Sequence, residues 1–190
     1  MKRIAVWIGA LAMTLLACSC ARDIYVSEAL QLPEHAPLYT RYNLYYENPE
    51  DMRSLNMLKG DMLPFGTEVV IDNATSREIE FHTVKDGRKF RLVFEEKYWL
   101  KSPEEYLRQV FSSDDADDLT VGIRPLVIEK LRRGIVEKGM SKKEVGLAYG
   151  PPATYRTPSQ SLNTWCYWTD ELVGKRVIFN RGAVVDIIQL

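Results

Sequence analysis

The N-terminus constrains this chain most, because it has the pattern of a segment that never enters the folded protein. Met1-Lys2-Arg3 is positively charged, and a mostly apolar run follows over residues 4–16. A helix needs about 20 residues to cross the hydrocarbon core of a bilayer, so this run is short for a permanent span. A charged start followed by a short apolar run is typical of a signal peptide, and we expect residues 1–17 to be removed.

The end of this run, Leu15-Leu16-Ala17-Cys18, resembles the bacterial lipobox, in which small residues precede a cysteine that is lipidated and becomes the new N-terminus. We therefore predict lipidation (palmitate among the chains) at Cys18, since several acyl chains hold a protein firmly at a membrane. The sorting rule that accompanies the resemblance in enterobacteria places a lipoprotein with Ser19 at the periplasmic face of the outer membrane. The alternatives are lipidation at Cys20, an ordinary secretory signal, or an uncleaved inner-membrane anchor.

The composition is that of an ordinary globular protein, 46% hydrophobic and 27% charged over 190 residues. The formal net charge is −1, and it becomes −3 in the 173-residue mature chain because the signal peptide contains two basic residues and no acidic one. This balance provides no basic field for nucleic acid. Three cysteines and two histidines are too few for a disulfide framework or a zinc cluster, and we expect no metal and no cofactor.

The first part of the mature chain divides into a tether and a β-rich domain. Residues 18–37 lack a sustained period and carry prolines, which predicts a flexible tether. Short alternating strands over residues 38–111 predict a small antiparallel β-barrel or sandwich. Leu63-Pro64-Phe65-Gly66-Thr67, ahead of a Val-rich strand, resembles bacterial SH3-like domains and implies an SH3-like barrel. Ser102-Pro103-Glu104-Glu105 is a capping box that opens a closing helix.

An acidic stretch follows and interrupts all periodicity. Residues 112–121 contain four aspartates within 114–118. A calcium-binding EF-hand loop needs Gly at its sixth and Glu at its twelfth position, and this stretch has neither at the required spacing. We therefore predict a solvated linker.

Residues 122–190 are predicted to contain two helices followed by three strands. Helical spacing covers residues 123–133, and Ser141 and Glu144 form a capping box for a second helix. The strands are expected at residues 164–168, 176–179 and 183–188. The whole chain is therefore predicted to be α+β.

Five short motifs in this last unit occur in the order that they have in one family. They are Gly-Met-Ser-x-x-Glu-Val at 139–145, Gly-Pro-Pro at 150–152, Asn-Thr-Trp-x-Tyr at 163–167, Val-x-Phe at 177–179 and Gly-x-Val-x-x-Ile at 182–187. Together they resemble the BamE/SmpA/OmlA-like domain of outer-membrane lipoproteins over residues 134–190. The resemblance implies an ααβββ two-layer fold, with two helices on one face of an antiparallel sheet, and a role beside β-barrel assembly components.

No motif of a catalytic site is present, whether a nucleophile elbow, a zinc-protease helix, a phosphate loop or a dinucleotide fingerprint. His35 lies in the expected tether, and His82 lies in the polar phase of a strand, where we expect a surface histidine. Cys166 is predicted to be a buried thiol, with pairing to Cys20 as the alternative. We therefore expect no enzyme.

The candidate binding residues are aromatic. Side chains alternate along a strand, so Trp165 and Tyr167 share one face and Trp168 lies on the other. One face must meet the helices, and the exposed set, together with Tyr155 and Arg156, is predicted to form a contact surface, because Trp, Tyr and Arg are enriched at interface hot spots. The alternative is that all three strand aromatics are core.

These features predict a non-catalytic lipoprotein of the cell envelope that binds protein partners and supports outer-membrane assembly or envelope integrity. One alternative is a module that binds peptidoglycan or peptides, as envelope SH3-like domains do. Another is an inhibitor of a periplasmic enzyme, which rests on fold analogy alone.

Overall fold

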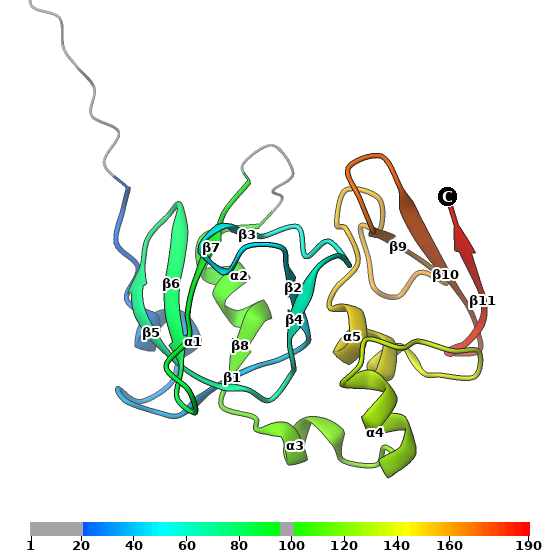
Figure 1. Ribbon diagram of the computed structural model, residues 1–190, viewed down its shortest axis with the longest axis horizontal. Coiled ribbons are helices and arrows are strands. Elements are labelled where there is room, and N and C mark those ends of the chain that lie inside the picture. The colour runs from blue at the N-terminus through cyan, green and yellow to red at the C-terminus, as the bar shows by residue number, and fades with distance from the viewer. Residues whose placement is uncertain (1–20, 96–100) are drawn as a thin grey trace, which may run out of the picture.

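The structure is a computed structural model that describes residues 21–95 and 101–190. The predicted lipidation at Cys18, and the alternatives that involve Cys20, lie outside the described residues. The chain is mixed α+β, as predicted, and Figure 1 shows a curled sheet in the first half and a smaller sheet covered by helices in the second. None of the described helices is long and apolar enough to cross a bilayer.

The first half is organised around a six-stranded sheet of order β3-β7-β6-β5-β1-β8. Its strands pair antiparallel except for the parallel pair of β3 with β7. Their bounds are β1 Leu38–Thr40, β3 Met52–Arg53, β5 Glu68–Ala74, β6 Glu78–Thr83, β7 Lys89–Val93 and β8 Phe111–Ser112.

The alternation in the sequence accounts for this sheet. In β6, Ile79 and Phe81 are fully buried between partly exposed polar neighbours, and in β7 Phe90 and Leu92 are buried in the same way. Helix α2, Pro103–Val110, adds Leu107 and other apolar residues to this core and begins with the predicted capping box. A short 3-10 helix, η1 Pro49–Asp51, precedes β3.

The segment expected to be a tether differs from that prediction. It contains α1, Val26–Leu30, and Ile24 and Ala29 are buried in the first core. The Ile24 backbone N–H donates to the carbonyl of Ala74 at 2.9 Å, and Arg22 pairs with Glu104 at 2.6 Å. Residues 22–30 are therefore part of the folded first half, because Ile24 and Ala29 pack into its core.

The acidic stretch also differs from the predicted linker. Ser112 belongs to β8, and α3 covers Ala116–Thr120. The Asp115 carboxylate accepts hydrogen bonds from the backbone N–H groups of Asp117 and Asp118 at 2.8 and 3.0 Å. Negative side chains are stabilised at a helix N-terminus, so these aspartates cap a short helix.

The second half contains the two helices and three strands that the sequence predicts. Helices α4, Pro125–Leu131, and α5, Lys142–Tyr149, precede β9 Thr164–Trp168, β10 Gly174–Asn180 and β11 Ala183–Gln189. The sheet order is β11-β10-β9, with antiparallel pairing throughout. Ser141 and Glu144 form the predicted capping box of α5.

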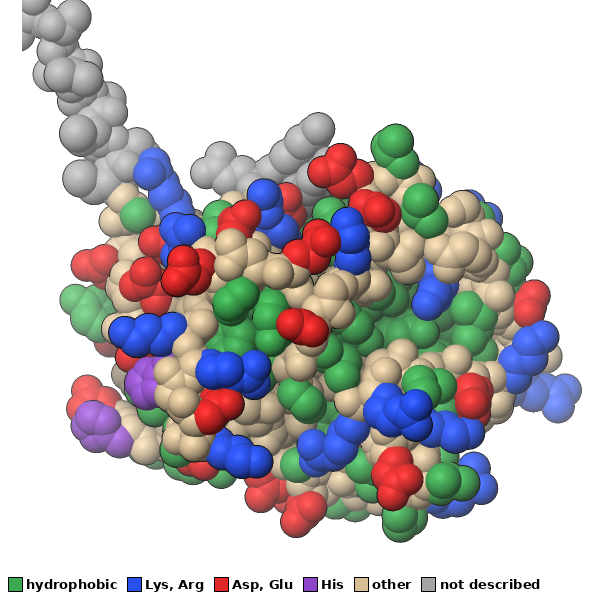
Figure 2. All heavy atoms as spheres, viewed as in Figure 1, with side chains coloured by type: hydrophobic (Ala, Val, Ile, Leu, Met, Phe, Trp, Pro, Cys, Tyr) green, Lys and Arg blue, Asp and Glu red, His purple; other side chains and the backbone are tan. Residues whose placement is uncertain are grey.

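A small strand pair lies where the two halves meet, β2 Leu44–Tyr46 with β4 Asp61–Leu63. Phe65, just after β4, is fully buried in the second core although it belongs to the first half of the chain. In the view of Figure 2, hydrophobic side chains gather in the middle of the molecule, between the two halves, and charged side chains surround them. The halves therefore share apolar contacts.

Candidate functional site

Strand alternation separates the candidate aromatic residues as expected, and the structure shows which face is buried. Trp165 and Tyr167 are 3% and 4% exposed and belong to the second core. The Tyr167 hydroxyl donates to the carbonyl of Gly150 at 3.1 Å, and the Trp165 ring packs edge-on against Phe179. The prediction that these two side chains form a contact surface is therefore wrong, because they fill the space between sheet and helices.

The other three candidates lie together on the opposite face of the sheet. The rings of Tyr155 and Trp168 stack with centroids 6.3 Å apart and planes inclined by 19°. The Arg156 guanidinium lies 4.7 Å from the centroid of the Trp168 ring. We call Tyr155, Arg156 and Trp168 the Trp168 cluster.

Hydrogen bonds to the backbone of Cys166 in β9 position this cluster. Ala153 donates its N–H to the carbonyl of Cys166 at 2.9 Å, and the Cys166 N–H donates to the hydroxyl of Thr157 at 3.0 Å. The segment between them, which carries Tyr155 and Arg156, is thereby held against β9. Cys166 itself is partly exposed, which differs from the expected buried thiol, and it is a free cysteine.

Exposed apolar residues continue the surface around the Trp168 cluster. Arg176 of β10 lies opposite both Cys166 and Ile188 in the strand register. Ile188 is 40% exposed, and Leu172, in the loop after β9, is 93% exposed. We call this side of β9–β11, together with the Trp168 cluster, the outer sheet face. It combines apolar side chains with two arginines, and no helix among the described residues covers it in Figure 1.

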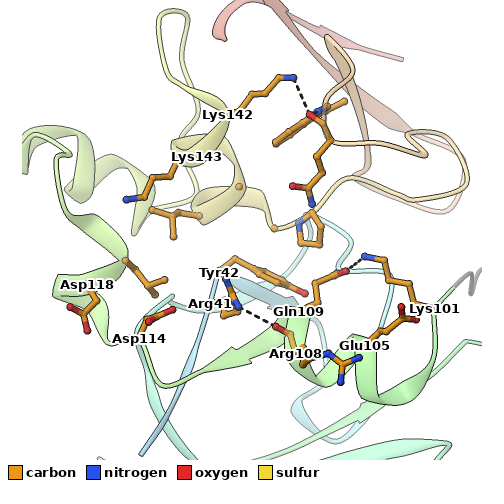
Figure 3. Close-up of a pocket in the computed structure, with 17 residues that line it drawn as sticks. Arg41, Tyr42, Lys101, Glu105, Arg108, Gln109, Asp114, Asp118, Lys142 and Lys143 are labelled. Carbon is orange, nitrogen blue, oxygen red and sulfur yellow. Dashed lines mark hydrogen bonds between the residues drawn. The ribbon is translucent and has the colours of Figure 1, made fainter. Parts of the chain in front are cut away.

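A second feature, a cleft of about 920 Å³ between the two halves, was not predicted. Figure 3 shows Lys142 and Lys143 of α5 on one side of it and Arg41, Arg108 and Lys101 on the other. The lining residues include no histidine, cysteine or serine. The described residues also contain no group of three or more side chains that suit a metal ion. The cleft can therefore present charges and hydrogen-bonding groups to a ligand.

One buried side chain fixes the two halves beside this cleft. Asn43 is fully buried, and its Nδ2 donates to the carbonyls of Leu131 at 2.7 Å and Ala148 at 3.1 Å. Its Oδ1 accepts from the Phe65 N–H at 3.0 Å, and its own N–H donates to the carbonyl of Leu147 at 3.0 Å. The sequence signals this contact only through the position of Asn43, a polar residue within the aromatic and apolar run of residues 42–46.

Burial also shifts the pKa of two side chains that line the cleft. It raises the pKa of Tyr42 to about 12, against the opposing effect of hydrogen bonds with Gln109 and Tyr106. Burial lowers the pKa of Lys101, and the charge of Glu105 opposes that change. Tyr42 is therefore neutral at neutral pH.

The histidines offer no catalytic arrangement in the described residues. His82 lies on β6 and contacts the Asp72 carboxylate through Nδ1 at 2.9 Å, on an exposed part of the first sheet. His35 lies in the loop after α1 with a φ of 63°. The two imidazoles therefore lie on the first half of the chain, and neither lines the cleft.

Comparisons with known proteins provide no neighbour for this arrangement: no family model, no curated protein and no solved structure matches the chain.

Proposed function

We propose that this chain is a non-catalytic lipoprotein of the outer membrane that binds a protein partner of the envelope through its outer sheet face. The observation that carries the proposal is the Trp168 cluster, in which an aromatic stack and a guanidinium are assembled at the surface of an otherwise uncovered sheet. Trp, Tyr and Arg are the residue types that dominate binding energy at protein interfaces.

The preorganisation of the cluster supports this role. Binding normally costs about 0.5–1.5 kcal/mol for each rotamer-rich side chain that becomes ordered. The Trp168 ring is already stacked against Tyr155, and Arg156 already lies over its face. The indole Nε1 of Trp168 is buried and has no hydrogen-bond partner among the described residues. A partner that docks here therefore meets ordered side chains.

The fold supports a finer proposal about each half. We assign residues 134–190 to a BamE-like domain for two reasons. The five sequence motifs occur in the family's order, and helix α5 is followed by three antiparallel strands. We assign residues 38–111 to an SH3-like barrel, since a curled sheet of short strands suits that class. On this assignment the role is support of β-barrel assembly or of envelope integrity.

Co-purification tests the proposal. The full chain, tagged and cross-linked in cells, is solubilised in mild detergent, and the proteins recovered are compared between wild type and the Trp168→Ala variant. We expect an envelope protein in the wild-type sample and its loss in the variant. Tyr25→Ala is the matched control, because Tyr25 is an aromatic side chain 73% exposed on the other half of the chain.

Two results would overturn the proposal. One is recovery of the same proteins by the wild type, Trp168→Ala and an untagged sample. The other is binding to purified sacculi with no envelope protein recovered, which would favour the cell-wall-binding alternative instead.

Lipidation is tested separately with radiolabelled palmitate. The Cys18→Ser variant should stay unprocessed and unlabelled, whereas Cys20→Ser should be processed and labelled like wild type. Label in Cys18→Ser with loss in Cys20→Ser would move the modification to Cys20, and label in neither wild type nor variants would remove the lipoprotein assignment.

A further inference from the structure

The cations of the cleft make hydrogen bonds to neutral acceptors. Arg41, Lys101, Arg108 and Lys143 come from three separated parts of the chain and line the same space. Their acceptors are the carbonyl of Arg108 for Arg41 at 3.3 Å, the carbonyl of Ala29 for Arg108 at 2.8 Å, the carbonyl of Val121 for Lys143 at 3.1 Å, and the Gln109 amide oxygen for Lys101. We call these four residues the cleft cations.

None of the cleft cations forms an ion pair within the described residues, although ten other ion pairs occur there. The carboxylates that line the cleft, Glu105, Asp114 and Asp118, form none either. With Lys142, five cations face three carboxylates, so the cleft carries an excess of two positive charges in a chain whose formal net charge is −1. A concave surface focuses such a field and raises the local concentration of anions.

Lys142 has a different role. Its Nζ donates to three consecutive backbone carbonyls, those of residues 160, 161 and 162, at 2.9, 2.9 and 2.8 Å. It also lies over the rings of Trp165 and Phe179, at 5.6 and 5.4 Å from their centroids. Lys142 therefore holds the loop before β9 in place and has no ammonium hydrogen to spare for a ligand.

The arrangement of the cleft favours an extended ligand with several anionic groups. In Figure 3, Lys143 and Lys101 lie toward opposite ends of the cleft. Arg41 and Arg108 lie on the side opposite Lys143. A compact anion can engage only part of this set. The lining also includes apolar and aromatic residues, namely Tyr42, Leu119, Leu147, Pro151 and Trp165. A ligand that fits has carboxylates and apolar side chains along one chain.

We propose that the cleft binds an acidic peptide segment of a protein partner, with Arg41 and Lys143 as contacts from opposite sides. Arginine binds carboxylates through its planar fork, and lysine adds a charge that can reorient. This is a second binding site, distinct from the outer sheet face, and it rests on neither the lipidation of Cys18 nor the Trp168 cluster. Asn43 keeps the two sides of the cleft in place.

Fluorescence polarisation with the purified full chain in detergent tests the proposal. The probe is a fluorescein-labelled oligoglutamate with interspersed leucines, compared with oligoglutamine and oligolysine versions of the same peptide. We expect the acidic peptide to bind at least about tenfold more tightly than the glutamine version, and its affinity to fall as salt rises.

The variant Arg41→Gln/Lys143→Gln is expected to lose about tenfold in affinity for the acidic peptide. The matched control is Lys85→Gln/Arg133→Gln, which removes two exposed positive charges outside the cleft and is expected to change affinity by no more than about twofold. Thermal unfolding by circular dichroism establishes that both variants fold, and each single substitution is measured in case a double variant does not. Trp168→Ala should bind the acidic peptide like wild type.

Three results would overturn the proposal: equal affinity for the glutamate and glutamine peptides, an equal loss in the cleft variant and its control, or displacement of the peptide by inorganic phosphate at matched ionic strength. Binding of anionic phosphatidylglycerol vesicles that depends on Arg41 and Lys143, without binding of the peptide, would assign the cleft to lipid headgroups instead. A failed co-purification at the outer sheet face leaves the peptide result unaffected, so the two proposals fail separately.

Discussion

Trp165 and Trp168 lie three residues apart on β9, and their surroundings differ in almost every respect. Trp165 is 3% exposed, donates from its indole nitrogen to the carbonyl of Gln160 at 3.2 Å and packs against Phe179. Trp168 stacks on a partly exposed tyrosine, and its indole nitrogen has no partner among the described residues. Composition alone cannot distinguish the two tryptophans. The inner face of the sheet packs into the core, and the outer face carries the surface proposed to bind a partner.

The largest effect that this comparison predicts is on the free energy of unfolding of Trp165→Ala. Truncating a buried Trp removes its packing and leaves a cavity, which costs about 3–5 kcal/mol. Urea unfolding followed by circular dichroism measures the loss. If Trp168→Ala were destabilised by the same amount, the distinction between the two faces would be wrong.

A smaller effect is expected for Tyr167→Phe, which keeps the ring and removes the hydroxyl that donates to Gly150. The lost hydrogen bond and the carbonyl left unpaired should cost about 1–2 kcal/mol at neutral pH. The T-shaped contact with the Tyr149 ring remains possible, so packing should change little. Urea unfolding at pH 7 provides the value.

The difference in stability between Tyr167→Phe and wild type should also depend on pH. Burial raises the pKa of Tyr167 well above its ordinary value. In the wild type the folded state therefore keeps this proton while the unfolded chain loses it, so the stability that it contributes is complete below pH 10 and is lost as pH rises above that value. Tyr167→Phe has no hydroxyl to titrate, so its deficit in the free energy of unfolding relative to wild type should shrink as pH rises above about 10. A constant deficit would show that Tyr167 titrates normally.

The smallest effect on stability is expected for Trp168→Ala, within about 1 kcal/mol of wild type, because Trp168 is less buried than Trp165 and stacks on the exposed Tyr155. The same variant should show the largest loss of partner recovery in the co-purification. Urea unfolding and co-purification on one preparation separate the two readouts. A strongly destabilised Trp168→Ala would mean that the outer sheet face is structural.

Features that depend on residues close in the chain could be predicted from the sequence. Both capping boxes, Ser102 with Glu105 and Ser141 with Glu144, join side chains three residues apart. Strand alternation likewise placed Trp165 and Trp168 on opposite faces. The pattern left open which face is buried, because that depends on where α4 and α5 pack.

Features that depend on distant contacts could not be predicted. Helix α1 has five residues, too few to be stable alone, and it forms because Ile24 and Ala29 enter a core built by α2 and the first sheet. The cleft joins Arg41 to Lys143 across about half of the chain, and these regions meet through contacts between distant residues, among them the hydrogen bonds of Asn43 and Tyr45 to the carbonyl of Ala148. A contact between residues so far apart in the chain leaves no periodic pattern in the sequence.

The fixed position of Ile24 would limit how far the folded body can lie from a membrane if the chain carries the proposed lipid. Ile24 is already fixed to β5 through the carbonyl of Ala74. With the lipid proposed at Cys18, six peptide units separate the bilayer from the folded body, and a fully extended chain of that length reaches about 20 Å. On that proposal the folded body stays in a thin layer next to the lipid headgroups, and any partner has to enter that layer to bind.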